Sequence, residues 1–152
     1  MSASMQIATL RRLFVSARAW LACFPMSIIL LGMRFGVGMV FFNSGLLKYN
    51  SWEFAIKLFE DEYKLPLLDP TVAARLAMFN ELTFPIFLFL GLATRLATLP
   101  LLGMVFVIEV FVYPQAWAEH LMWASMLVLL LTRGPGVFSL DYLIERHFAK
   151  SD

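Results

Sequence analysis

Long apolar stretches separated by polar segments dominate the pattern of the chain. Four of them cover residues 25–47, 72–92, 96–113 and 117–131, with few charged positions inside. A helix needs about 20 residues to cross a hydrocarbon core about 30 Å thick. The pattern therefore predicts four transmembrane helices.

Local sequence signals predict where these helices begin and end. Asp69 is a good N-cap residue, and Pro70 after it fits the first turn of a helix, so the second span is expected to start there. Pro114 is expected to end the third span. The Gly-Pro-Gly sequence at 134–136 is expected to end the fourth, because neither residue type extends a helix.

Three shorter amphipathic segments lie outside the predicted spans. Residues 10–20 and 139–148 place apolar side chains on one helical face and charged side chains elsewhere. Residues 52–63 repeat apolar and aromatic side chains at helical spacing within the longest connection. Helices of this kind lie along a membrane surface, so we predict interfacial helices in all three places.

The composition agrees with a membrane location. Hydrophobic residues make up 61% of the 152 residues and charged residues only 15%, whereas about one-quarter of a soluble domain is charged. We therefore predict a single all-α domain over residues 1–152, an integral membrane four-helix bundle in contact with the lipid bilayer. The net charge of +1 gives no reason to expect a nucleic-acid partner.

Basic residues are distributed unequally between the two ends of the predicted bundle. One end carries Arg11, Arg12, Arg18, Arg95, Arg133, Arg146 and Lys150. The other end carries Lys48, Lys57, Lys64 and Arg75, which are outweighed by Glu53, Glu60, Asp61, Glu62 and Asp69. Because segments rich in lysine and arginine stay in the cytoplasm, we predict cytoplasmic N and C termini.

Three charged residues, Arg34, Glu81 and Glu109, lie inside the predicted spans. A charge near the middle of a membrane helix costs about 3 kcal/mol or more on insertion scales, so each needs a partner or water. Counting about 1.5 Å per residue along antiparallel helices brings Arg34 and Glu81 to similar depths, which predicts an ion pair between them. Glu109 lies nearer the outer face, where Lys48 and His120 are expected.

Each of these residues also has a purely structural interpretation. A buried pair of Arg34 and Glu81 can serve only to fix the register of two helices. Lys48 can extend its ammonium group to the outer headgroups, and His120 can be an interfacial residue at a helix end. The sequence leaves both interpretations open.

A quinone is the ligand that best suits this set of side chains. Its oxygens need hydrogen-bond donors, its reduction needs groups that transfer protons, and its ring needs an apolar slot. The expected site combines the donors Arg34, Lys48 and His120, the proton-transferring carboxyls Glu81 and Glu109, and the ring walls Phe41, Phe42 and Trp52.

The chain lacks the residues for several redox centres. Cys23 is the single cysteine, so neither a disulfide nor a thiolate cluster for iron–sulfur or zinc can form within one chain. His120 and His147 would lie roughly 40 Å apart along a continuous helix, so they cannot both ligate one haem. We therefore expect no haem, iron–sulfur cluster, zinc or other metal bound by this chain alone. Electrons for any redox step must come from a partner.

Three motifs follow one another along the chain. They are Arg34-Phe-Gly-Val-Gly through Ser44-Gly-Leu-Leu-Lys48, then Glu81 followed by Leu90-Gly-Leu-Ala-Thr-Arg95-Leu-Ala, and finally Gly134-Pro-Gly-Val-Phe-Ser-Leu-Asp141. In this order and spacing they resemble the DoxX-like family of small four-helix bacterial membrane proteins. The positions shared with the family pattern are Arg34, Lys48, Glu81 and Asp141.

The resemblance implies a four-helix fold with cytoplasmic ends in a bacterial cytoplasmic (inner) membrane. It also implies a role beside an oxidoreductase, because the family is named for a membrane subunit associated with thiosulfate:quinone oxidoreductase. Three functions remain open: a quinone-contacting subunit of an oxidoreductase, a non-catalytic accessory or assembly subunit, and a carrier for a small solute or metal ion. Four short helices bury little surface, so other subunits or a homo-oligomer are expected.

Overall fold

The protein is built from helices. The computed structural model describes residues 3–66 and 68–149, with side chains from residue 10 onward, and these residues contain no strand. The α-helices are α1 (Ala3–Ala22), α2 (Met26–Asn50), α3 (Trp52–Leu58), α4 (Pro70–Leu90), α5 (Thr94–Val107), α6 (Trp117–Arg133) and α7 (Leu140–Phe148). Two π-helical turns, η1 (Phe59–Tyr63) and η2 (Ile108–Val112), and a 3-10 turn, η3 (Pro114–Ala116), complete the set. The predicted all-α fold class is confirmed.

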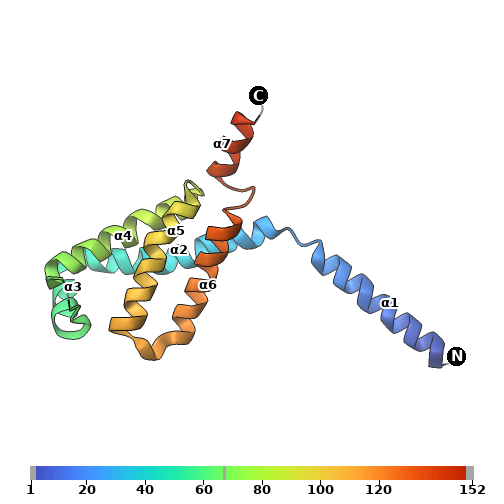
Figure 1. The fold of residues 1–152 in the computed structure, drawn as a ribbon, viewed down its shortest axis with the longest axis horizontal. Coiled ribbons are helices and arrows are strands. Elements are labelled where there is room, and N and C mark those ends of the chain that lie inside the picture. The colour runs from blue at the N-terminus through green and yellow to red at the C-terminus, as the bar shows by residue number, and fades with distance from the viewer. Residues whose placement is uncertain (1–2, 67, 150–152) are drawn as a thin grey trace.

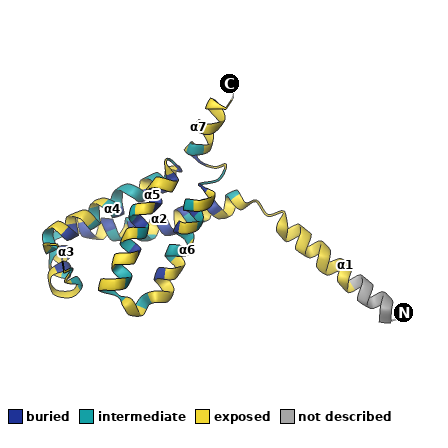
Figure 2. Ribbon diagram, viewed as in Figure 1, coloured by how far each residue is buried: buried dark blue, intermediate teal, exposed yellow. Residues whose placement is uncertain are grey.

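Four helices form the bundle that carries the core. α2 packs against α4 and α6, and α5 packs against the same two helices, so the four surround one interior (Figure 1). The centre of this interior is closed by fully buried aliphatic side chains, which are Val37, Leu88, Leu101, Leu127 and Leu130. Many large apolar side chains are exposed, as expected of helices whose surroundings are lipid. Exposed positions run along all the bundle helices (Figure 2).

Three helices of the described chain are long and apolar enough to cross a membrane. They are Met26–Asn50, Pro70–Leu90 and Thr94–Val112, the last combining α5 with η2. α6 has 17 residues, which corresponds to about 25 Å of helix, somewhat less than the bilayer core. The observed helices agree closely with the predicted spans, whereas the total of four crossings remains a prediction.

The predicted helix ends are confirmed. The Asp69 carboxylate accepts the backbone N–H groups of Thr71 and Val72, which caps the start of α4. Gly134 ends α6, and Pro114 follows the end of η2. These ends depend on local chemistry, which is why the sequence predicts them well.

The three predicted interfacial segments are helical. α3 and η1 fold over one end of the bundle, where Phe59 packs on Ala73 and Ala74. α7 starts at the predicted cap, because the Ser139 hydroxyl accepts the N–H of Tyr142. α1 extends away from the bundle, and its described side chains are exposed (Figures 1 and 2). Their contact with lipid, and the cytoplasmic ends, remain predictions; Lys150 lies outside the described residues.

Candidate functional site

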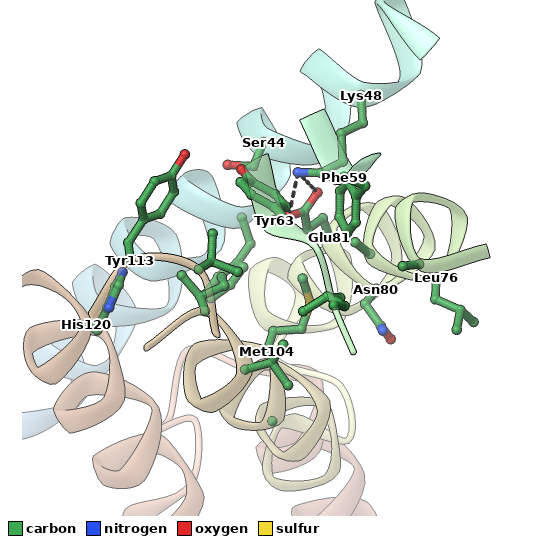
Figure 3. Close-up of a pocket in the computed structure, with 18 of the residues that line it drawn as sticks. Ser44, Lys48, Phe59, Tyr63, Leu76, Asn80, Glu81, Met104, Tyr113 and His120 are labelled. Carbon is green, nitrogen blue, oxygen red and sulfur yellow. Dashed lines mark hydrogen bonds and ion pairs between the residues drawn. The ribbon is translucent and has the colours of Figure 1, made fainter. Parts of the chain in front are cut away.

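A cavity of about 580 Å³ lies between the four helices of the bundle, beneath η1 (Figure 3). Most of its lining is apolar, and a few polar side chains reach into it from different helices. The polar groups are Lys48, Tyr63, Asn80, Glu81, Tyr113, Glu119, His120 and Ser44. A mainly apolar cavity of this size with a few polar groups is typical of small-molecule sites.

Lys48 and Glu81 form a buried ion pair in this cavity. The Lys48 ammonium donates a hydrogen bond of 2.9 Å to Oε1 of Glu81 and lies 2.8 Å from Oε2 (Figure 3). Their residue exposures are only 9% and 4%. Gly45 makes the approach of α2 to α4 possible, because a Cβ at this position would lie 2.9 Å from Cβ of Glu81.

The Glu81 carboxylate has unused accepting capacity. Although Oε2 is close to the Lys48 ammonium, it is buried without a properly directed hydrogen-bond donor among the described residues. A carboxylate can accept about four hydrogen bonds, and a buried polar atom without one is unfavourable by about 1–3 kcal/mol. Oε2 is itself fully buried beside the ammonium, so a ligand hydroxyl would reach it only after the surrounding side chains shift.

His120 and Glu109 form a second polar contact at another wall of the cavity. Nδ1 of His120 lies 2.6 Å from Oε2 of Glu109, as expected from the sequence. Lys48, which was expected beside Glu109 as well, pairs with Glu81 instead. His120 lines the cavity, whereas Glu109 lies outside it in a groove with Trp117 and Leu121. Since Glu109 engages Nδ1, the other ring nitrogen, Nε2, is the atom of His120 left for a ligand.

Aromatic rings connect the two polar parts of the cavity. The His120 ring lies 5.3 Å from the Trp123 ring, and the Trp123 ring meets Phe41 edge-on at 5.9 Å. Both Phe41 and Trp123 line the cavity. The sequence predicted Phe41 here and missed Trp123, whose spacing does not separate it from the lipid-facing aromatic side chains.

Two tyrosines and Glu62 form the roof. The Tyr113 hydroxyl donates to Oε1 of Glu62, and the Tyr63 and Tyr113 rings meet edge-on with centroids 5.7 Å apart. Both tyrosines lie beyond the membrane-spanning helices. The hydrogen bond to Glu62 raises the pKa of Tyr113, and burial raises the pKa of Tyr63. Both hydroxyls therefore remain protonated at neutral pH. No local pattern in the sequence indicates this contact.

Removing the Tyr113 hydroxyl is expected to loosen the roof. Tyr113→Phe keeps the ring and loses the hydrogen bond that ties η2 to η1, which is worth about 1 kcal/mol. Hydrogen exchange of the amides of residues 59–63 should accelerate about fivefold. Tyr49→Phe on the exposed face of α2 is the matched control. Unchanged exchange in Tyr113→Phe would show that the contact does not hold the roof.

Arg34 lies at the opposite end of the bundle from this cavity and does not line it. It is 1% exposed. Its Nε donates to the Leu88 carbonyl at 2.7 Å and its Nη2 to the Phe89 carbonyl at 2.9 Å. Its Nη1 donates to the carbonyls of Pro135 and Phe138 at 3.0 and 2.7 Å. Arg34 therefore satisfies the last carbonyls of α4 and ties them to the segment after α6.

The predicted ion pair between Arg34 and Glu81 is wrong. Gly38 of α2 faces Phe89 of α4, and Gly45 faces Glu81. Arg34 precedes Gly45 by 11 residues, or about 16 Å along the axis, which is too far for contact. The sequence estimate assumed that the two helices end at the same level, whereas the start of α2 extends beyond the end of α4.

Asp141 stabilises the same end of the bundle. Its carboxylate accepts the N–H groups of Ala93 and Thr94 at 2.7 and 3.0 Å, which caps the start of α5. Its own N–H donates to the Gly91 carbonyl. Arg34 and Asp141 are two of the four positions shared with the family pattern. Both stabilise this end of the bundle through their hydrogen bonds.

Phe42 does not line the cavity, and neither does Trp52. It packs beside Phe59 and Ala73 on the outer side of the bundle, and the Arg75 guanidinium lies 5.9 Å from its ring centroid. The predicted ring wall at Trp52 is therefore wrong, because α3 turns this side chain toward α4. Of the predicted residues, the cavity brings together Lys48, Glu81, His120 and Phe41, with Glu109 behind His120.

Comparison with known proteins gives a family and a bacterial relative. A family model described as DoxX matches residues 29–114, more than half of the chain. A protein of Haemophilus influenzae described as uncharacterized is 30% identical over 129 residues, which cover 78% of this chain and 85% of the relative. No solved structure matches the chain significantly. Within the described residues, no group of three or more histidine, cysteine or acidic side chains is arranged to hold a metal ion.

Proposed function

The chain belongs to the DoxX family, whose members are membrane proteins linked to oxidoreductase function. We propose that it is the quinone-binding membrane subunit of an oxidoreductase assembly. The observation that carries the proposal is the buried Lys48–Glu81 pair, with an unused acceptor oxygen, in an apolar cavity between membrane helices. A charged pair is expensive at such a position, so a functional reason for it is expected.

The cavity suits both redox forms of a quinone head group. The oxidised ring carries carbonyl oxygens, which need donors, and the Lys48 ammonium can supply one. Because Nδ1 of His120 donates to Glu109, Nε2 donates to a carbonyl only when the ring is an imidazolium and accepts from a quinol hydroxyl when the ring is neutral. The reduced ring carries hydroxyl groups, one of which can donate to the carboxylate of Glu81, a residue of the cavity lining. Phe41 and Trp123 provide aromatic surfaces beside the ring.

Proton transfer and electron supply are assigned to different molecules in this proposal. Quinone chemistry takes up two electrons and two protons, and Glu81 and the Glu109–His120 contact are the groups that can exchange protons near the ring. The described side chains offer no centre that stores electrons. A partner subunit with its own redox centre supplies them.

The proposed setting is a bacterial inner membrane crossed four times, with both termini in the cytoplasm. Arg95, Arg133 and Arg146 belong to the end held by Arg34 and Asp141, whereas Glu62 belongs to the roof over the cavity. Under the rule that positive loops remain inside, the cavity lies in the outer half of the bilayer.

Quinone retained through purification tests the function. The protein extracted gently from bacterial membranes should carry ubiquinone or menaquinone at close to one equivalent, measured by chromatography of the extracted lipids. Its absence, together with no binding of added quinone in lipid nanodiscs, would leave the accessory or carrier functions as the better explanation. Uptake of a solute by proteoliposomes that contain only this chain would favour the carrier.

Substitutions at Glu109 are expected to separate charge from hydrogen bonding. Glu109→Gln keeps an oxygen that can accept from Nδ1 of His120, so the Kd for quinone should change less than about threefold. Glu109→Leu leaves Nδ1 without its partner and should weaken quinone binding about tenfold. Equal affinities for the wild type and Glu109→Leu, measured by titration in nanodiscs, would remove this contact from the site.

A further inference from the structure

We propose that the cavity opens sideways into the bilayer between α4 and α5, and that the isoprenoid tail of a lipid-soluble quinone lies in this opening. The inference rests on the proposed quinone site and narrows its ligand class. The ligand is a membrane quinone with an apolar tail, which enters from lipid rather than from water.

Most walls of the cavity are closed. Above it, Phe59 of η1 is buried against α4, and Tyr113 is tied to Glu62. Below it, the bundle core closes the interior around Leu88 and Leu101. The α2–α4 side is held by the Lys48–Glu81 pair, and the side between η2 and α6 by the Glu109–His120 contact.

The exposed part of the lining gathers on one side. Among the residues that line the cavity, those classed as exposed are Leu68, Leu76, Gly103, Val107 and Glu119. Leu68 and Leu76 belong to α4 and the segment before it, and Gly103 and Val107 belong to α5. Glu119 alone lies elsewhere, near the start of α6. α4 and α5 meet at their short turn and spread apart away from it (Figure 1).

Gly103 marks this opening at the middle of the membrane. It is central in the span Thr94–Val112, and a Cβ added to it would meet no atom within 4 Å. The neighbouring exposed side chains, Leu76 and Val107, are apolar. An opening at this depth leads into hydrocarbon, where the flexible tail of a quinone already resides. A water-soluble ligand would find no favourable route there.

A side chain added at Gly103 tests the inference. A Cβ at Gly103 would meet no atom within 4 Å, and phenylalanine is no worse than glycine in a helix, so we choose Gly103→Phe. Gly36→Phe on α2 is the matched control, because Gly36 is also exposed with no atom within 4 Å of an added Cβ and lies outside the cavity. The probes are a ubiquinone with a short isoprenoid tail and the same head group without a tail, titrated in nanodiscs.

We expect Gly103→Phe to weaken binding of the tailed quinone at least about tenfold, since the new ring occupies the path of the tail. Its affinity for the tail-less head group should stay within about twofold of the wild type. Gly36→Phe should change neither affinity. Equal thermal unfolding temperatures of both variants and the wild type establish that the fold is intact.

The outcomes distinguish the two proposals. If the wild type binds neither probe, the quinone function is wrong. If the wild type binds both and Gly103→Phe weakens neither, or weakens both alike, the function stands and the lateral opening is wrong. An equal loss of tailed quinone binding in Gly36→Phe would also overturn the opening.

Discussion

Replacing Arg34 with methionine is expected to cause the largest loss of stability in this chain. The substitution leaves four buried or partly buried carbonyl oxygens, two from α4 and two from the segment after α6, without their common donor. The Leu88 oxygen keeps the N–H of Gly91, and each of the other three oxygens, if left unpaired in a buried place, costs about 1–3 kcal/mol. The thermal unfolding temperature in detergent should fall by more than about 10 °C.

Two further variants sharpen this prediction. Arg34→Lys should be intermediate, because an ammonium has three N–H groups and cannot reproduce the planar fork of arginine. Arg18→Met, on the exposed part of α1, removes a positive charge outside the junction and should leave the unfolding temperature unchanged. If Arg34→Met and the control Arg18→Met unfold at the same temperature, the hydrogen bonds of Arg34 do not hold the end of α4 to the segment after α6. Quinone affinity should survive in Arg34→Lys, because Arg34 lies outside the cavity.

The second large effect is expected at Lys48 and Glu81, where stability and binding should respond differently. Glu81→Gln or Lys48→Met leaves one partner charged, buried and without its counter-charge, which should destabilise the fold by about 3–5 kcal/mol. Lys48→Met combined with Glu81→Met replaces the pair with apolar side chains of similar volume. Its stability should equal or exceed that of the wild type.

Quinone binding should not recover with stability in the double variant. The cavity then lacks both the ammonium donor and the carboxylate acceptor, so the Kd should rise at least about a hundredfold, which corresponds to about 2.7 kcal/mol of lost interaction. Nanodisc titration and thermal unfolding of the two single variants and the double variant measure both properties. A double variant that is stable and still binds quinone as the wild type does would show that the pair only fixes the packing of α2 on α4.

Features set by neighbouring residues could be predicted from the sequence. The cap at Asp69, the helix start at Pro70 and the stop at Gly134 all depend on short-range hydrogen bonding and backbone freedom. The amphipathic repeat of residues 52–63 likewise identified the helix that covers the cavity. A charged side chain is unfavourable in lipid, so a charged residue inside an apolar span is expected to be buried in the bundle. Glu81 could therefore be predicted as a buried residue from the sequence alone.

Features set by contacts between distant residues could not be predicted. The partner of Glu81 is Lys48 rather than Arg34, because the offset between α2 and α4 depends on which side chains pack between them. Asp141 caps a helix that begins 47 residues earlier in the chain, at Thr94. Nothing local to either residue indicates this contact. The direction of Trp52 has the same kind of origin, since the turn between α2 and α3 decides it.

Photolabelling with an azido-quinone in native membranes tests the central claim most directly. The account predicts that the label attaches to cavity-lining residues of α2, α4 and α6, near Lys48, Glu81 and His120, and that excess untagged quinone prevents it. The Lys48→Met/Glu81→Met variant should not be labelled there. Labelling confined to the lipid-facing surfaces, or labelling of the cavity that persists unchanged in the double variant, would contradict the account.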